Sequence, residues 1–193
     1  LVGEDAAEII ARASNGGVSA DALTGLAQFG HIPGMVGTSP VSIVRLPAIG
    51  ARNENVYSVI GRRSQVHNVR SALRAAGAID ADAAALDVMR VESGFPEWGI
   101  DMDENTLPQE ANLDEMHAVS YTKGCYIGQE TVARIHFRGH VNRSLRRLAF
   151  SDGIQPPRGA VLQDSEHRGL GEVRSTACRE RAGALDLGMV RDR

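Results

Sequence analysis

The spacing of apolar residues predicts alternating helices and strands over the first part of the chain. From Val66 to Ala76 apolar residues recur at intervals of three or four, which places them on one face of a helix. Helices are predicted over residues 4–13, 19–29 and 64–76, and strands over residues 41–46 and 55–60. Residues 34–39 are expected to form a loop. Pro47 is expected to end the strand before it, because proline cannot donate to a sheet.

The pattern changes after Gly139, where short apolar and polar alternations are separated by turn residues. Strands are predicted over residues 144–150, 160–163, 169–174 and 184–189. Short strands at such regular spacing are typical of a small antiparallel barrel or sandwich. The predicted fold class is therefore α+β: a ferredoxin-like α/β domain over residues 1–143 is followed by a small antiparallel β-barrel over residues 144–193.

A long segment between these patterns is poor in apolar residues. Residues 85–92 predict one more element, helix or strand, and residues 94–112 are rich in Gly, Pro, Asp and Glu, which predicts a loop. A brief helix is expected over residues 113–119, and a longer one from near Gly128 to Gly139. A loop of this length inside a compact domain is usually functional or disordered.

Composition narrows the class of protein. The chain has 193 residues, 42% hydrophobic residues and a net charge of −3, which is ordinary for a globular protein. No apolar run approaches the roughly 18 residues that a membrane helix needs. Cys125 and Cys178 lie far apart in unrelated contexts, so neither a disulfide framework nor a metal or redox pair is indicated. These features favour a cytoplasmic location.

Cys125 is the first candidate for chemistry. Lys123, the only lysine in the chain, lies two residues before it, and a helix is expected to begin near Gly128. A helix N-terminus and a nearby ammonium both favour the thiolate form of a cysteine. The alternative is that Cys125 is a small buried packing residue.

Several motifs together resemble the YgfZ-type folate-binding proteins. These are Lys-Gly-Cys-Tyr-x-Gly-Gln-Glu over residues 123–130 with Arg134 after it, the block from Arg90 to Asp101, and Pro-Gln-Glu-Ala over residues 108–111. That family is related to the aminomethyltransferase, or T-protein, of the glycine cleavage system, which lacks the cysteine motif. The resemblance covers most of the chain and implies that the N-terminal part of the family is missing, so a truncated chain is expected.

The resemblance implies that Glu92 contacts the pterin ring of tetrahydrofolate. A pterin presents an N–H and an amino group side by side, and the two oxygens of a carboxylate can accept both hydrogen bonds. From spacing alone, Glu92 could instead form a surface ion pair with Arg90 or another arginine. Trp98 stands where the T-protein branch has a tyrosine, so it is expected either to stack on the ligand or to anchor a core.

A basic stretch without acidic residues lies between Glu130 and Asp152. Arg134 and Arg138 within it could attract the glutamate tail of folate, an RNA backbone or an acidic protein, or they could simply be solvated. The negative net charge and the lack of interleaved aromatic residues argue against direct nucleic-acid binding. His136 and His140 lack an intervening glutamate, so no metal site is expected.

Two functions follow from the resemblance. The first is a folate-dependent accessory factor that supports maturation or repair of iron–sulfur enzymes, including those that modify tRNA, with iron–sulfur assembly or client proteins as partners. The second is an aminomethyltransferase that moves a one-carbon unit onto tetrahydrofolate. The cysteine motif favours the first, because aminomethyl transfer needs an acidic residue rather than a thiol. Whether the chain is an enzyme stays open at this point.

Overall fold

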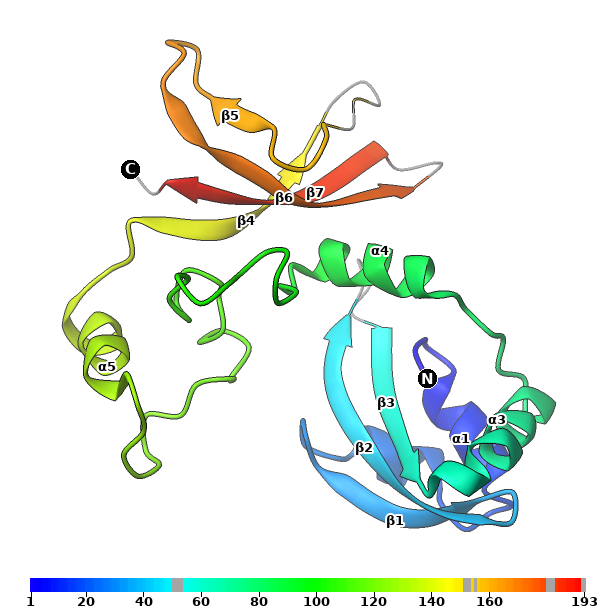
Figure 1. Ribbon diagram of the computed structural model, residues 1–193. Helices are drawn as coiled ribbons and strands as arrows, with labels where there is room; N and C mark the ends of the chain where they lie inside the picture. Colours follow the sequence, from blue (N-terminus) through cyan, green and yellow to red (C-terminus); the bar gives the residue numbers. More distant parts are fainter. Residues whose placement is uncertain (50–53, 151–153, 155, 180–182, 192–193) are drawn as a thin grey trace. The chain divides into compact units, whose positions relative to one another are not determined.

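The computed structural model describes residues 1–49, 54–150, 154, 156–179 and 183–191, with the side chains of 178, 179 and 183–185 excepted (Figure 1). The chain forms two compact units, Leu1–Ala85 and Leu86–Arg193. Helix α4 (Ala83–Ser93) spans the junction between them. The two domains predicted from the sequence, residues 1–143 and 144–193, are domains of the family rather than these compact units, and they stay a prediction.

The first unit is a three-stranded antiparallel sheet with helices packed against it. Its elements are α1 (Ala6–Ala13), α2 (Ala20–Thr24), β1 (His31–Val36), β2 (Ser39–Ile49), β3 (Glu54–Gly61), the 3₁₀ turn η1 (Arg63–Gln65) and α3 (Val66–Ala75). The strand order is β1-β2-β3. Ile10 of α1, Leu23 of α2 and Ile43 of β2 are fully buried in one core, so the apolar faces predicted from the sequence meet there.

Three local predictions for this unit are wrong in detail. Residues 34–39 are not a loop, because His31–Val36 forms edge strand β1 in register with β2. Pro33 is tolerated there because an edge strand has one side without partners. Pro47 does not end β2, which continues to Ile49 through a register shift. The helix predicted over 19–29 is only Ala20–Thr24, capped by the hydroxyl of Ser19, which accepts from Ala22 N at 3.1 Å.

The second unit contains a four-stranded antiparallel sheet and a long irregular segment. Its further elements are α5 (Gln129–Arg138), β4 (Arg143–Ala149), β5 (Val161–Gln163), β6 (Gly169–Arg179) and β7 (Gly183–Arg191), and the strand order is β4-β7-β6-β5. Val91 of α4 packs with Leu145, Leu187 and Met189 on one face of this sheet. The four predicted strands are confirmed. Among the described residues β4 and β5 are the sheet edges, and closure into a barrel stays a prediction.

The segment between α4 and α5 is the least regular part of this unit. The predicted loop over 94–112 is confirmed, and α5 begins after Gly128 as expected, with φ 86° at that glycine. The brief helix expected over 113–119 is wrong, since residues 113–117 form only turns. Asn112 and His117 have φ values of 59° and 55°, outside the helical range, which prevents a continuous helix.

No helix among the described residues is both long enough and apolar enough to cross a membrane.

Candidate functional site

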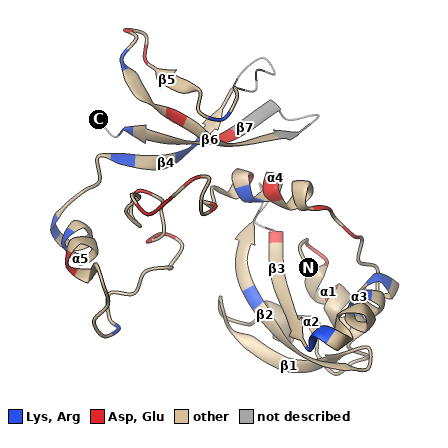
Figure 2. Ribbon diagram, in the orientation of Figure 1, with Lys and Arg blue, Asp and Glu red and all other residues tan. Residues whose placement is uncertain are grey.

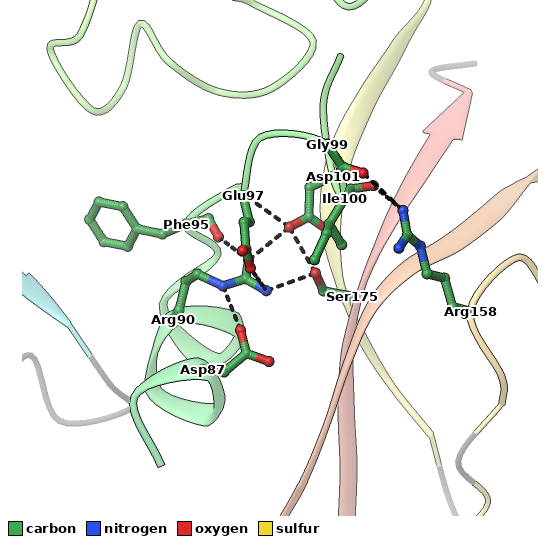
Figure 3. A network of polar contacts seen from close by, with 9 residues as sticks. All are labelled: Asp87, Arg90, Phe95, Glu97, Gly99, Ile100, Asp101, Arg158 and Ser175. Carbon is green, nitrogen blue, oxygen red and sulfur yellow. Dashed lines mark hydrogen bonds and ion pairs between the residues drawn. The ribbon is translucent and has the colours of Figure 1, made fainter. Parts of the chain in front are cut away.

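Arg90 of α4 is the centre of a polar network that fastens the irregular segment to the sheet (Figure 3). Its guanidinium donates to the Asp87 carboxylate at 2.7 Å, to the Phe95 carbonyl at 2.7 Å and to the Ser175 hydroxyl of β6 at 2.8 Å. Ser175 lies in register with Leu187, on the face of the sheet against which Val91 packs. Arg90 therefore connects one helix, one loop and one strand.

Asp101 completes this network from inside the loop. One of its carboxylate oxygens, Oδ2, accepts from Arg90 Nη1 at 2.7 Å, Ser175 Oγ at 2.8 Å and Glu97 N at 2.9 Å, and the residue is 0% exposed. Burial alone would lower the pKa of Arg90, but its hydrogen bond to Asp87 and the charge and hydrogen bond of Asp101 outweigh it and raise that pKa. We call Arg90, Asp101 and Ser175 the clamp. It fixes the position of the last turn of α4.

Glu92 lies in that last turn and is only 6% exposed. Its backbone carbonyl accepts from Arg147 Nη1 of β4 at 3.1 Å. Gly94, with φ 78°, then turns the chain out of the helix. A carboxylate this deeply buried does not fit the alternative of a solvated surface pair. The clamp and Arg147 together hold Glu92 on a rigid element, and a side chain that binds a ligand needs such support.

Trp98 follows in the loop and is 66% exposed, so the alternative that it anchors a core is wrong. Its backbone forms an isolated bridge with Met102, and Gly99 N donates to the Met102 carbonyl at 2.8 Å. Arg158 donates to the Gly99 and Ile100 carbonyls at 3.2 and 3.4 Å. The loop backbone is therefore braced while the indole ring stays open to solvent.

Cys125 is exposed, in a segment without helix or strand just before α5. It is therefore not the buried packing residue of the alternative interpretation. The ammonium of Lys123 lies 4.8 Å from the centre of the Tyr126 ring and forms a cation–π contact with it. Tyr126 is the residue that directly follows Cys125. The structure thus places thiol, lysine and helix start in one short segment, and the thiol is accessible.

A cluster of side chains that the sequence did not reveal fastens α5 to the segment before it. The Tyr121 hydroxyl donates to Asp114 Oδ1 at 2.5 Å, and His136 Nδ1 of α5 lies 3.3 Å from Asp114 Oδ2. The Tyr121 and His136 rings stack with centroids 3.8 Å apart. Burial and the hydrogen bond to Asp114 raise the pKa of Tyr121 to about 12, with Gln109 opposing. His136 thus has an aspartate partner, and the described residues contain no group of three metal-binding side chains.

Charge is divided within the second unit. Acidic side chains are concentrated in the segment after α4, and basic side chains on α5 and β4 (Figure 2). Arg143 of the basic stretch forms an ion pair with Glu110 and donates to its carboxylate at 2.9 and 3.2 Å. Arg134 and Arg138 lie one turn apart on α5, and both are exposed. Neither of the two described cavities is lined by Glu92, Trp98 or Cys125.

No family model matches the chain. In sequence it is 37% identical to the mitochondrial iron–sulfur cluster assembly factor IBA57 homolog of Mycosarcoma maydis, over 53% of this chain and 27% of that protein. It is 40% identical to the tRNA-modifying protein YgfZ of Yersinia enterocolitica, over 41% of this chain and 23% of that protein. The chain thus spans about a quarter of the length of these curated relatives.

In structure the chain resembles the glycine cleavage system aminomethyltransferase T from Bartonella henselae, with a TM-score of 0.73 and 22% identity over 96% of this chain and 48% of that one. The mixed fold predicted from the sequence is therefore confirmed. The predicted resemblance to the YgfZ and aminomethyltransferase superfamily is confirmed as well, by the sequence relatives and by this fold.

Proposed function

We propose that the chain is a tetrahydrofolate-binding accessory protein of the cytoplasm that supports the maturation or repair of iron–sulfur enzymes, and through them tRNA modification. The observation that carries the proposal is the buried Glu92, held by the clamp at the end of α4, in a chain similar to an iron–sulfur assembly factor and to tRNA-modifying proteins. Iron–sulfur assembly or client proteins are the partners that this function requires.

The residues present fit a reduced folate. A carboxylate such as that of Glu92 can accept hydrogen bonds from the adjacent N–H and amino groups of a pterin edge, and burial strengthens such charge-assisted hydrogen bonds. The exposed Trp98 offers a ring on which a flat ligand can stack. When bound, tetrahydrofolate supplies a carrier for one-carbon units. Glu92 orients the ligand, while Arg90 and Asp101 hold Glu92 in place.

Calorimetric titration with tetrahydrofolate tests the role of Glu92. Glu92→Gln keeps the shape of the side chain but removes its charge, and it should weaken binding by about 10- to 100-fold, the loss expected for one charge-assisted hydrogen bond. Glu115→Gln, an exposed acid in the turns after the loop, is the matched control and should bind as the unmodified chain does. Equal affinity of Glu92→Gln would leave Glu92 a structural residue, and no binding by the unmodified chain would remove folate from the proposal.

We assign the reactive chemistry to Cys125, with Lys123 favouring its thiolate. Alkylation by iodoacetamide, in which the thiolate attacks the reagent and iodide leaves, should proceed faster at Cys125 than at Cys178, whose side chain lies outside the described residues. Lys123→Ala should slow the reaction at Cys125, whereas Lys123→Arg should retain the rate because it keeps a cation. Mass spectrometry at each cysteine measures both rates. If Lys123→Ala alkylates at the original rate, the lysine has no part in the chemistry.

We assign the glutamate tail of folate to Arg134 and Arg138. Polyglutamylated folate should then bind more tightly than the monoglutamate, and the gain should shrink with salt, because exposed charges are screened over about 8 Å at physiological ionic strength. The double change Arg134→Gln and Arg138→Gln should abolish the gain. Arg168→Gln, which removes an exposed arginine paired with Asp164 and Glu166, should leave it intact. Equal binding of both folates by the unmodified chain would rule out this assignment.

Aminomethyl transfer is the alternative, and the fold of the aminomethyltransferase neighbour is what supports it. Against it stands the exposed Cys125, because transfer of a one-carbon unit to folate does not use a thiol. A deletion strain distinguishes the two functions. Loss of iron–sulfur enzyme activity with glycine cleavage intact supports the accessory role, and the opposite result supports the transferase.

A further inference from the structure

A second polar site lies on the four-stranded sheet, apart from Glu92 and Cys125. A cavity of about 230 Å³ opens on the face of the sheet that also carries Leu145. It is lined by side chains and backbone from all four strands: Arg143, Val161, Gly171, Glu172, Arg174, Met189 and Arg191. The floor is apolar, since Met189 is 4% exposed and belongs to the core cluster of this unit. The lining carries three arginines, Arg143, Arg174 and Arg191, and one acid, Glu172.

The strand register brings two of these arginines together. Arg143 of β4 lies directly opposite Arg191 of β7. Like charges at directly opposite positions destabilise an antiparallel pair unless an anion lies near them. Glu110 compensates Arg143 through a two-point contact at 2.9 and 3.2 Å. Arg191 is exposed and lines the cavity, and no ion pair is found for it among the described residues, which end at this arginine.

Arg174 adds an unsatisfied donor. Its Nη2 contacts Glu172 at 2.7 Å, but its Nε is buried and finds no hydrogen-bond acceptor among the described residues. A buried charged donor without an acceptor is energetically unfavourable. The charges of these arginines also act on Asp103. The pKa of Asp103 is lowered first by the Thr106 hydroxyl and the Asn105 N–H, and further by the charges of Arg174 and Arg143.

Gly171 allows the two central strands at this cavity to lie close together. A Cβ at Gly171 would collide with the Met189 carbonyl oxygen, so glycine is needed for β6 to approach β7 this closely at the cavity.

We propose that this cavity binds a small oxyanion, either a phosphate group or the carboxylate end of an organic acid. Guanidinium groups pair with both through parallel N–H donors. Arg191 and Arg174 supply guanidinium groups at the cavity, and Met189 gives an apolar floor for the carbon chain of an organic acid. This site does not depend on folate binding.

Titration of the 193-residue chain with inorganic phosphate and, separately, with glutarate tests the proposal. Amide NMR signals of Gly171 and Met189 should shift saturably at low ionic strength. Arg191→Gln should weaken binding by about tenfold, the loss of one charge-assisted contact. The affinity of Arg191→Lys should lie between those of the unmodified chain and Arg191→Gln, because lysine keeps the charge but lacks the paired N–H donors of a guanidinium. Arg168→Gln, on the turn between β5 and β6, is the control and should match the unmodified chain.

The relative affinity identifies the source of the anion: tighter phosphate binding indicates a phosphorylated ligand, and tighter glutarate binding indicates an organic acid. The proposal is overturned if neither anion shifts these signals. It is also overturned if Arg191→Gln, shown to be folded by its circular dichroism, binds as tightly as Arg168→Gln.

Discussion

Asp101 and Asp186 are both 0% exposed, but their surroundings are opposite. Asp101 receives three hydrogen bonds on one oxygen, one of them from the Arg90 guanidinium. Asp186 of β7 accepts only from Ala177 N, at 3.2 Å. Each acid also has one buried oxygen without a hydrogen-bond partner among the described residues, Oδ1 of Asp101 and Oδ2 of Asp186, so the difference between them is the cation beside Asp101. Because successive side chains of a strand point to opposite faces, Asp186 lies on the other side of the sheet from its neighbour Leu187 and hence from the clamp.

The comparison shows two ways in which a protein accommodates a buried carboxylate. At the clamp the negative charge is neutralised by a cation, so the network can hold the loop and Glu92 in one arrangement. On the far face burial raises the pKa of Asp186, with the Ala177 N–H opposing, so the group moves toward its neutral form. Asp101 thus keeps its negative charge at the clamp, whereas burial on the far face disfavours the charged form of Asp186.

The largest effect is expected at the clamp. Asp101→Ala leaves the Arg90 guanidinium, whose side chain is 17% exposed, beside an empty space and without its main countercharge. Removing one partner of a buried ion pair typically costs about 3–5 kcal/mol. Urea unfolding followed by circular dichroism should show this loss of stability in the second unit.

Glu97→Ala is the matched control for Asp101→Ala. Glu97 contacts the same guanidinium at 3.5 Å, but its side chain is 48% exposed, so the cost should stay below about 1 kcal/mol. Equal losses in the two variants would mean that burial does not distinguish the carboxylates of this network, and the comparison would fail.

Glu110 should show an intermediate effect. It is 7% exposed, but its partner Arg143 is 39% exposed and stays solvated when the acid is removed. Glu110→Ala also frees the Leu107 N–H, which donates to the carboxylate at 3.0 Å. A loss of about 1–3 kcal/mol is expected in the same unfolding experiment. Glu115→Ala, an exposed acid nearby, should be close to neutral, and a loss as large as that of Asp101→Ala would contradict the ranking.

Asp186→Asn should have a smaller effect than Asp101→Ala or Glu110→Ala, and of the opposite sign. Since the folded-state pKa of Asp186 lies above its ordinary value of 3.8, its contribution to stability is complete below that pH and is lost as the pH rises through the folded-state pKa. At neutral pH the uncharged Asn should therefore stabilise the chain, by on the order of 1 kcal/mol. Unfolding measured from pH 3 to pH 8 should show a flatter profile for the variant over this window.

Asp103→Asn is a control for Asp186→Asn, because the contribution of Asp103 to stability changes with pH in the opposite direction. The pKa of Asp103 is lowered, chiefly by the Thr106 hydroxyl, so its contribution is present above its ordinary value of 3.8 and is lost as the pH falls through the folded-state pKa. This variant should be destabilised at neutral pH. If both variants change stability in the same direction at neutral pH, the assignment for Asp186 is wrong.

Local chemistry in the sequence determined several elements of this protein correctly. Apolar periodicity located α1 and α3, and alternation located all four strands of the second unit, because each pattern is written in neighbouring residues. Gly128 marked the start of α5, since only glycine readily adopts the φ of 86° found there. The motifs around Glu92 and Cys125 also gave the resemblance that the sequence relatives confirm.

Where sequence reasoning failed, a contact far along the chain decided the outcome. Residues 34–39 are predicted to form a loop, yet pairing with β2 makes residues 34–36 part of strand β1. Residues 113–119 looked helical, but the segment is held as turns by long-range partners: Asn112 donates to the Leu145 carbonyl at 2.8 Å, and Asp114 binds Tyr121 and His136. Local propensity is a weak preference that such contacts override.

The candidate site divides along the same line. The sequence by itself determined that Glu92, Trp98, Lys123 and Cys125 are the residues to consider. Only the tertiary structure decided that Glu92 is buried, that Trp98 and Cys125 are exposed, and that Ser175, 85 positions after Arg90, completes the clamp. Burial and long-range hydrogen bonds depend on how distant strands and loops pack, and no local pattern of residue types encodes that packing.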